Sequence, residues 1–288
     1  MDGIENTFES DDFEITTRQR NANFVKEDSE CQQSINELKK IEKFLENLGF
    51  LTFGRDTVLG IFDTKTTSFS LNSLMSSLEL TMGSVIACCE SACIADANTL
   101  LRKYRDDLFF YLYISVYNSL EMNSEKAKTM AVQIERWINN DLSDFQIGQV
   151  LKAIAAIPQL RDTVAKYHLK ETFQNIGNYL NNYVHGNGHS YYNRSYFPYK
   201  KNALAVKLKE IENNARYLTV VFMLLLIFCF PSLVMAEDYV GYLDMNLTPP
   251  ENSQYWVASF VENFMKENIS LIDKNCLDYL QENTMMQF

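Results

Sequence analysis

The sequence predicts an all-α protein: a multi-helix bundle with a long central apolar helix and a short C-terminal helical appendage. Of its 288 residues 47% are hydrophobic, enough to bury one large core or two small ones. Only 10 Gly and 5 Pro are present, too few for the many turns of a sandwich of short strands. Apolar residues also recur at helical spacing, first in the series Ile35, Leu38, Ile41, Phe44, Leu45 and Leu48.

The chain divides into three parts by composition. Residues 1–30 are polar and acidic and predict a flexible N-terminal arm, 31–236 predict the helical bundle, and 237–288 predict the appendage. The N-terminus lacks the charged and then apolar pattern of a signal peptide. Six cysteines without a second pair at zinc spacing indicate buried free thiols in a reducing cytosol. We therefore expect a cytoplasmic protein, with no metal or other cofactor.

Helix caps and helix breakers divide the bundle. The first helix begins at Cys31 and ends at Gly49, and a short extended piece is expected around 58–62. Asp96 and Ser124 are residue types that cap helix N-termini, and Pro158 ends a helix. The next expected helices cover about 72–93, 96–120, 124–140, 143–157 and 159–185. The last part predicts a long helix over 200–230 broken at Pro231, then two short helices, from 251 and over 271–280.

The stretch Tyr217 to Ala236 has two interpretations. It carries no charge over 20 residues, a length that can cross a bilayer, and the basic residues before it would then face the cytoplasm. Its strictly apolar part, Val220 to Phe230, has only 11 residues and is followed by Pro231, which is typical of a buried core helix. A buried core helix and a membrane segment both remain open.

The charge balance and the missing motifs exclude several functions. A net charge of −11 argues against nucleic-acid binding over the whole protein surface, although it is compatible with a local basic patch. The sequence has no phosphate-binding GxxxxGK[ST] loop, no GxGxxG after a strand, no GxSxG and no HExxH. These absences argue against nucleotide hydrolysis, dinucleotide chemistry, a serine hydrolase and a zinc protease.

The segment LLRKYRDDLFFYLY places two arginines on an apolar helix. Arg105 lies in an otherwise apolar stripe, where an unpaired guanidinium is costly, and Arg102 and Asp106 are spaced to pair. One interpretation is an internal ion-pair network with Glu90, Asp106 or Asp107. The other is an arginine that reaches a polar site shared with a histidine.

The segment NIGNYLNNYVHGNGHSYYNR supplies that histidine. His185 follows Asn181 and Asn182 at the predicted end of a helix, where the helix dipole favours an imidazolium. A histidine that titrates near neutral pH can act as a general acid or base. Side chains that could hold a phosphodiester and stack on bases follow it: Tyr191, Tyr192, Arg194, Lys200 and Lys201.

The motif NNYVHGN resembles that of the HEPN superfamily, in which a polar residue and a following histidine at a helix end cut RNA. The helix carrying LLRKYRDDLFFYLY also resembles a long helix of HEPN-like families tied to abortive infection, and the likeness covers roughly 70–230. It implies a metal-independent endoribonuclease with His185 as general acid/base and Asn181 or Asn182 in the polar position. The arginine usual before the histidine is absent, so Arg102 or Arg105 would have to replace it.

Three hypotheses follow. The first is a HEPN-type ribonuclease or toxin-like effector in phage defence, which acts on RNA and pairs with a second copy of the chain. The second is a non-catalytic helical interaction protein (an antitoxin, adaptor or assembly subunit) with a protein partner. The third is an effector anchored in the membrane by a single span, Tyr217 to Ala236.

Overall fold

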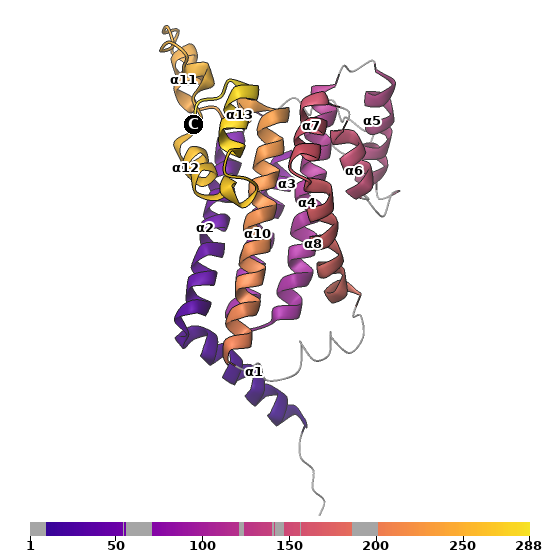
Figure 1. Cartoon of the computed structure of the whole chain (residues 1–288), viewed down its shortest axis with the longest axis vertical. Helices are drawn as coiled ribbons and strands as arrows, with labels where there is room; N and C mark the ends of the chain where they lie inside the picture. Colours follow the sequence, from indigo (N-terminus) through magenta and orange to yellow (C-terminus); the bar gives the residue numbers. More distant parts are fainter. Residues whose placement is uncertain are drawn as a thin grey trace, which may run out of the picture.

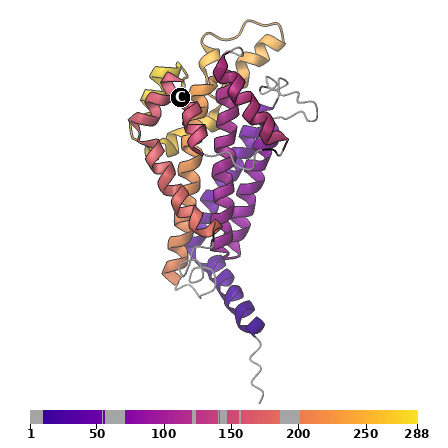
Figure 2. The same cartoon turned by 90° about the vertical axis from the view of Figure 1, so that its right-hand side faces the viewer.

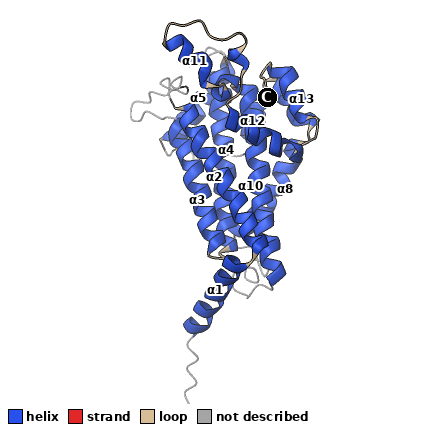
Figure 3. Ribbon diagram, turned by 90° about the vertical axis from the view of Figure 1, so that its left-hand side faces the viewer, coloured by secondary structure: helices blue, strands red, loops and turns tan. Residues whose placement is uncertain are grey.

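The computed structural model describes residues 10–53, 55, 71–120, 124–139, 141, 147–155, 157–185 and 201–288. Within these ranges the chain forms helices and two isolated β-bridges, so the predicted all-α class is confirmed (Figure 3). Four long helices build the bundle: α2 (Ser29–Thr52), α3 (Leu71–Glu90), α4 (Ile94–Ser119) and α10 (Lys201–Cys229). They pack in a closed ring, α2 on α3, α3 on α4, α4 on α10 and α10 on α2 (Figure 1). The expected extended piece around 58–62 lies outside the described residues.

The predicted long apolar helix is α10, with nearly the expected bounds. Its residues Val220 to Ile227 are all at most 2% exposed, because α2 and α4 cover them. Within the bundle, the Tyr104 hydroxyl and the Thr219 hydroxyl share a buried hydrogen bond of 2.7 Å between α4 and α10. The part Ala203–Cys229 is long and apolar enough to cross a membrane, but 72% of its most apolar window is buried inside the protein. This burial supports the core interpretation.

The N-terminal region differs from the expected flexible arm. Ser10–Glu27 forms helix α1, which extends from one end of the bundle (Figure 1) and contacts α2, α3 and α10. Val25 is fully buried against the core, and Asp28 caps α2 by accepting the Cys31 N–H at 2.9 Å. Burial of the last turn of α1, together with this cap, gives part of the acidic segment an ordered position.

Four shorter helices follow α4: α5 (Glu125–Ile138), α6 (Ile147–Ile154), α7 (Pro158–Lys166) and α8 (Leu169–Val184). They form an outer layer, in which α5, α6 and α8 contact α4, and α7 contacts α8 and α10 (Figure 2). Ser124 caps α5, as predicted, by accepting the Ala127 N–H at 3.2 Å.

Three predictions about helix boundaries are wrong. The single helix expected over 159–185 is divided, because His168 adopts a left-handed conformation (φ 50°) between α7 and α8. The chain can therefore change direction there and pack both helices. Pro158 is the first residue of α7 and does not end the preceding helix; at that position the missing proline N–H costs no hydrogen bond. Helix α4 begins at Ile94, ahead of the expected cap Asp96.

The predicted helical appendage is present, with one helix more than expected. Its helices are α11 (Glu237–Asp244), α12 (Ser259–Asn268) and α13 (Cys276–Thr284), joined by short 3-10 turns. Phe264 of α12 stacks on Phe44 of α2 with ring centroids 4.0 Å apart. The Gln287 N–H donates to the Tyr255 carbonyl at 2.7 Å, so the C-terminus is tied back to the appendage.

All six cysteines are free, and Cys31, Cys89 and Cys276 are the buried thiols that the sequence predicts. Burial raises the pKa of Cys31 to about 12 and that of Cys276 to about 11. These thiols are therefore parts of the core, held in the neutral form.

Candidate functional site

The two segments that the sequence analysis singled out lie side by side, because α8 packs along α4. Arg102 of α4 donates from Nε to the side-chain oxygen of Asn181 on α8 at 2.9 Å, across 79 positions of sequence. An arginine of α4 therefore contacts the helix that ends at His185.

The two arginines share one carboxylate. Arg105 donates to Asp106 Oδ1 from Nη2 at 3.0 Å and from Nε at 3.2 Å, and Arg102 pairs with Asp106 Oδ2. Of the other carboxylates proposed as partners, Glu90 pairs with Lys39 and Asp107 pairs with Lys103. The structure thus contains a feature of each interpretation of the arginine helix: the arginines form an ion-pair cluster with Asp106, and Arg102 also contacts α8.

Arg105 is buried with only 2% of its surface exposed, and Gly177 provides the room for it. A Cβ at position 177 would overlap Arg105 Nη1, so any side chain there would displace the guanidinium. Burial, and next the neighbouring charge of Arg102, lower the pKa of Arg105 to about 9. Sequence reasoning missed Gly177, although a glycine inside a helical pattern is a signal of close packing.

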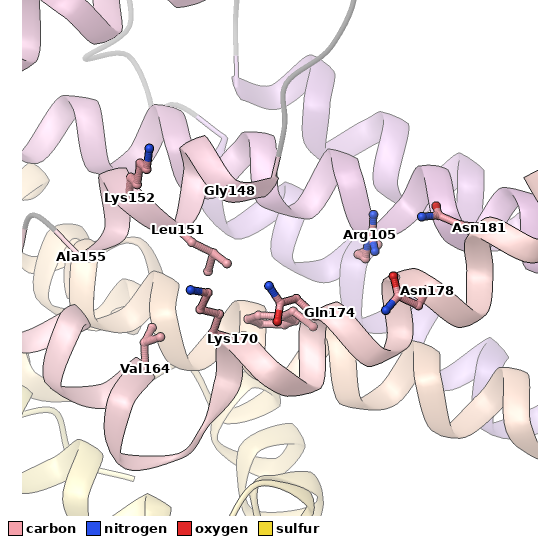
Figure 4. Close-up of a pocket in the computed structure, with 12 residues that line it drawn as sticks. Arg105, Gly148, Leu151, Lys152, Ala155, Val164, Lys170, Gln174, Asn178 and Asn181 are labelled. Atoms are coloured by element: carbon pink, nitrogen blue, oxygen red, sulfur yellow. The ribbon is translucent and has the colours of Figure 1, made fainter.

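A pocket of about 560 Å³ opens beside this cluster, between α4, α6, α7 and α8 (Figure 4). Its polar lining consists of three cations and three amides: Arg105, Lys152, Lys170, Gln174, Asn178 and Asn181. Its apolar lining includes Leu151, Val164 and Phe173. The described lining residues include no carboxylate, so the pocket is cationic in a protein of net charge −11.

Arg105 and Asn181 lie at one end of the pocket and Lys152 near the other, with Gln174 and Asn178 along α8 (Figure 4). These α8 residues are three or four positions apart and therefore occupy one helix face. Sequence reasoning named Arg105 and Asn181 but missed Lys152 and Lys170, which come from helices that only the fold brings together.

His185 stands at the C-cap of α8, as the sequence predicts, and its backbone N–H donates to the Asn181 carbonyl at 3.1 Å. Its ring is exposed. It lies four residues beyond Asn181, about 6 Å along the helix axis. Asn182 is also exposed, so of the two candidate asparagines Asn181 is the one that contacts an arginine.

The structure does not describe the side chains of the remaining predicted substrate-binding residues. Tyr191, Tyr192, Arg194 and Lys200 lie outside the described residues. Lys201 is the first residue of α10, and its side chain is likewise outside the described part.

Among the described residues, no group of three or more His, Cys, Asp or Glu side chains is arranged to hold a metal ion. Comparison with known protein families, with characterised proteins and with solved structures finds no match to this chain. The site is thus defined by its own residues: a cationic, amide-lined pocket beside α8, the helix whose C-cap is the exposed His185.

Proposed function

We propose that this protein is a ribonuclease effector of HEPN type, toxin-like and acting in phage defence, with His185 as general acid/base. The main support is the hydrogen bond from Arg102 Nε to Asn181 Oδ1 at 2.9 Å. It holds a guanidinium against Asn181, four residues before His185 on α8, and so offers a cation that the motif around the histidine lacks.

In this mechanism His185 accepts the proton of an RNA 2′-hydroxyl as that oxygen attacks the adjacent phosphorus. The bond from phosphorus to the 5′-oxygen breaks, which leaves a 2′,3′-cyclic phosphate, and the 5′-oxygen takes up a proton from solvent water. Arg102 and Asn181 stabilise the charge on the phosphate oxygens. The exposure of His185 gives a large substrate access to the ring.

The test is cleavage of labelled single-stranded RNA by the purified full-length chain. We expect His185→Ala to lower the rate at least about 100-fold, the usual contribution of a general acid or base. The matched control is His168→Asn at the other end of α8, because His168 is exposed and asparagine tolerates its left-handed backbone. Equal cleavage by wild type and His185→Ala, with folding verified by circular dichroism, would remove His185 from the mechanism.

A non-catalytic interaction protein is the second candidate, favoured by the surface of α11. This helix has no buried residue and projects from one end of the molecule (Figure 1). Large apolar side chains on and after it are exposed by 36% to 64%: Val240, Tyr242, Leu243, Met245 and Leu247. The segment 217–265 contains no Lys or Arg and includes Glu237, Asp238 and Asp244. A partner would therefore present an apolar surface with basic residues around it.

This candidate predicts co-purification of a stoichiometric partner that Leu243→Ser releases. Val132→Ser on α5 is the matched control, since Val132 is an exposed apolar residue (56%) away from the appendage. Release by both variants, or by neither, argues against α11 as the interface.

As part of the proposal we assign α10 to the bundle core and not to a membrane. Crossing a bilayer would separate Val220–Ile227 from the α2 and α4 side chains that bury them. Membrane fractions of expressing cells, washed with carbonate, provide the test. Protein that stays with the washed membranes would support the membrane-anchored alternative.

A further inference from the structure

The cationic pocket between α4, α6, α7 and α8 has features that cleavage at His185 does not use. His185 is not among its lining residues. We propose that this pocket binds a small phosphate monoester with an apolar body, held through Arg105, Lys152 and Lys170. The inference rests on the pocket alone and does not require ribonuclease activity.

The charge balance is the first argument. Arg102 and Arg105 share the single carboxylate of Asp106. Lys152 and Lys170 have no ion-pair partner in the described part of the chain. Among the described residues, three cations and no carboxylate line the pocket, an excess that suits a phosphate dianion better than a single carboxylate ligand.

The position of Arg105 is the second argument. Its Nε and Nη2 are both held by Asp106 Oδ1, and its Nη1 occupies the space that Gly177 leaves by lacking a side chain. A guanidinium fixed on two sides loses little freedom when it binds a ligand. The cation is therefore preorganised at one end of the pocket (Figure 4).

The amides add directional donors. Asn181 Oδ1 accepts the Arg102 hydrogen bond, which leaves the Asn181 amide N–H groups as donors. Asn178 and Gln174 line the same helix face. Amide donors beside cations are a usual way to bind phosphate oxygens.

The apolar wall accounts for the organic part of the ligand. Leu151, Val164 and Phe173 line the pocket, and Phe173 is held edge-to-face against Phe109 with ring centroids 4.6 Å apart. The volume of about 560 Å³ lies within the range of about 300 to 1,000 Å³ of small-molecule sites. An inorganic phosphate ion alone would leave this wall uncovered.

Isothermal titration with four probes tests the proposal: phenyl phosphate, ribose 5-phosphate, inorganic phosphate and phenol. We expect phenyl phosphate to bind about 10-fold more tightly than inorganic phosphate, because the ring covers the apolar wall. Phenol should not bind detectably. Tighter binding of ribose 5-phosphate than of phenyl phosphate would indicate a sugar phosphate as the source of the phosphate group.

Variants locate the site. Lys170→Gln and Lys152→Gln should each weaken phenyl phosphate binding about 10-fold or more, the usual loss for one charge-assisted hydrogen bond. Lys126→Gln on α5 is the matched control, since Lys126 is exposed and does not line the pocket. His185→Ala should bind phenyl phosphate as the wild type does, so a failed cleavage assay leaves this test intact. Unchanged affinity in both pocket variants, or equal binding of phenol and phenyl phosphate, would overturn the proposal.

Discussion

Within the described residues, two places bury a charged side chain, and they differ in how the charge is balanced. Glu212 of α10 is fully buried and pairs with Lys209, at 2.5 Å, and with Arg216. These cations lie three residues before it and four after it, and both are partly exposed, by 48% and 22%. Arg105 of α4 is also buried, but it shares its one carboxylate partner, Asp106, with Arg102.

The difference teaches that charge balance, and not burial alone, separates a structural ion cluster from a candidate site. Glu212 has two cations of its own helix, and both of them reach solvent. Arg105 has half of one carboxylate and faces a pocket that contains further cations. A ligand can therefore improve the balance at Arg105, whereas it would add nothing at Glu212.

The largest expected effect is that of Asp106→Asn. It removes the carboxylate from a buried arginine, and we expect it to lower the free energy of unfolding by about 3 kcal/mol. Urea unfolding followed by circular dichroism measures this change. Asp162→Asn is the control, because Asp162 and its partner Arg161 are both about 60% exposed and their pair contributes at most about 0.5 kcal/mol. A small effect of Asp106→Asn would mean that Arg105 is balanced in another way.

The effect of Glu212→Gln should be smaller, about 2 kcal/mol. The amide keeps the shape of the carboxylate, and Lys209 and Arg216 can move their charges toward solvent. The same urea titration compares the two variants directly. If Glu212→Gln destabilises the protein more than Asp106→Asn does, the two clusters do not differ in the way described.

Gly177→Ala tests how much the close packing of Arg105 against α8 contributes to stability. Alanine normally stabilises a helix interior relative to glycine, but here its Cβ would overlap Arg105 Nη1. We expect a loss of about 1 to 2 kcal/mol from displacement of the buried guanidinium. Gly241→Ala in α11 meets no atom within 4 Å and should be neutral or stabilising by up to about 1 kcal/mol. Stabilisation by both substitutions would show that Arg105 moves at no cost.

The smallest expected effect is a dependence of the free energy of unfolding on pH. Because the pKa of Arg105 is lowered to about 9 in the folded protein, the folded chain releases its proton at a pH where the unfolded chain still holds it. Stability contributed by this group therefore rises with pH above about 9. Between about pH 8 and pH 10, wild type should gain about 1 kcal/mol of unfolding free energy relative to Arg105→Met.

Buried thiols act in the opposite direction but cancel in this comparison. The raised pKa of Cys31, about 12, means that stability is lost as the pH rises from the ordinary thiol pKa toward that value. Both proteins carry this thiol. Glu212→Gln keeps Arg105 and should show the wild-type gain, so a gain that persists in Arg105→Met would assign it to another group.

Much of the fold could be predicted from local sequence. The cap at Ser124, the pairing of Arg102 with Asp106 and the bounds of α10 all depend on residues within a few positions of one another. The break at His168 was missed, because a left-handed residue other than glycine or asparagine carries no clear local signal. The helix α11 was missed because it buries no apolar face, which is the pattern that predicts a helix.

The sequence by itself determined the helical class and the apolar central helix, and it singled out Arg102, Arg105, Asn181 and His185 as candidates. Only the tertiary structure decided that Arg102 contacts Asn181, that Gly177 admits Arg105, and that Lys152 and Lys170 face the same pocket. The physical reason is the sequence separation over which each effect acts. Helix periodicity and capping depend on residues about four positions apart, whereas the site joins four helices that meet only when the apolar faces of the bundle are buried together.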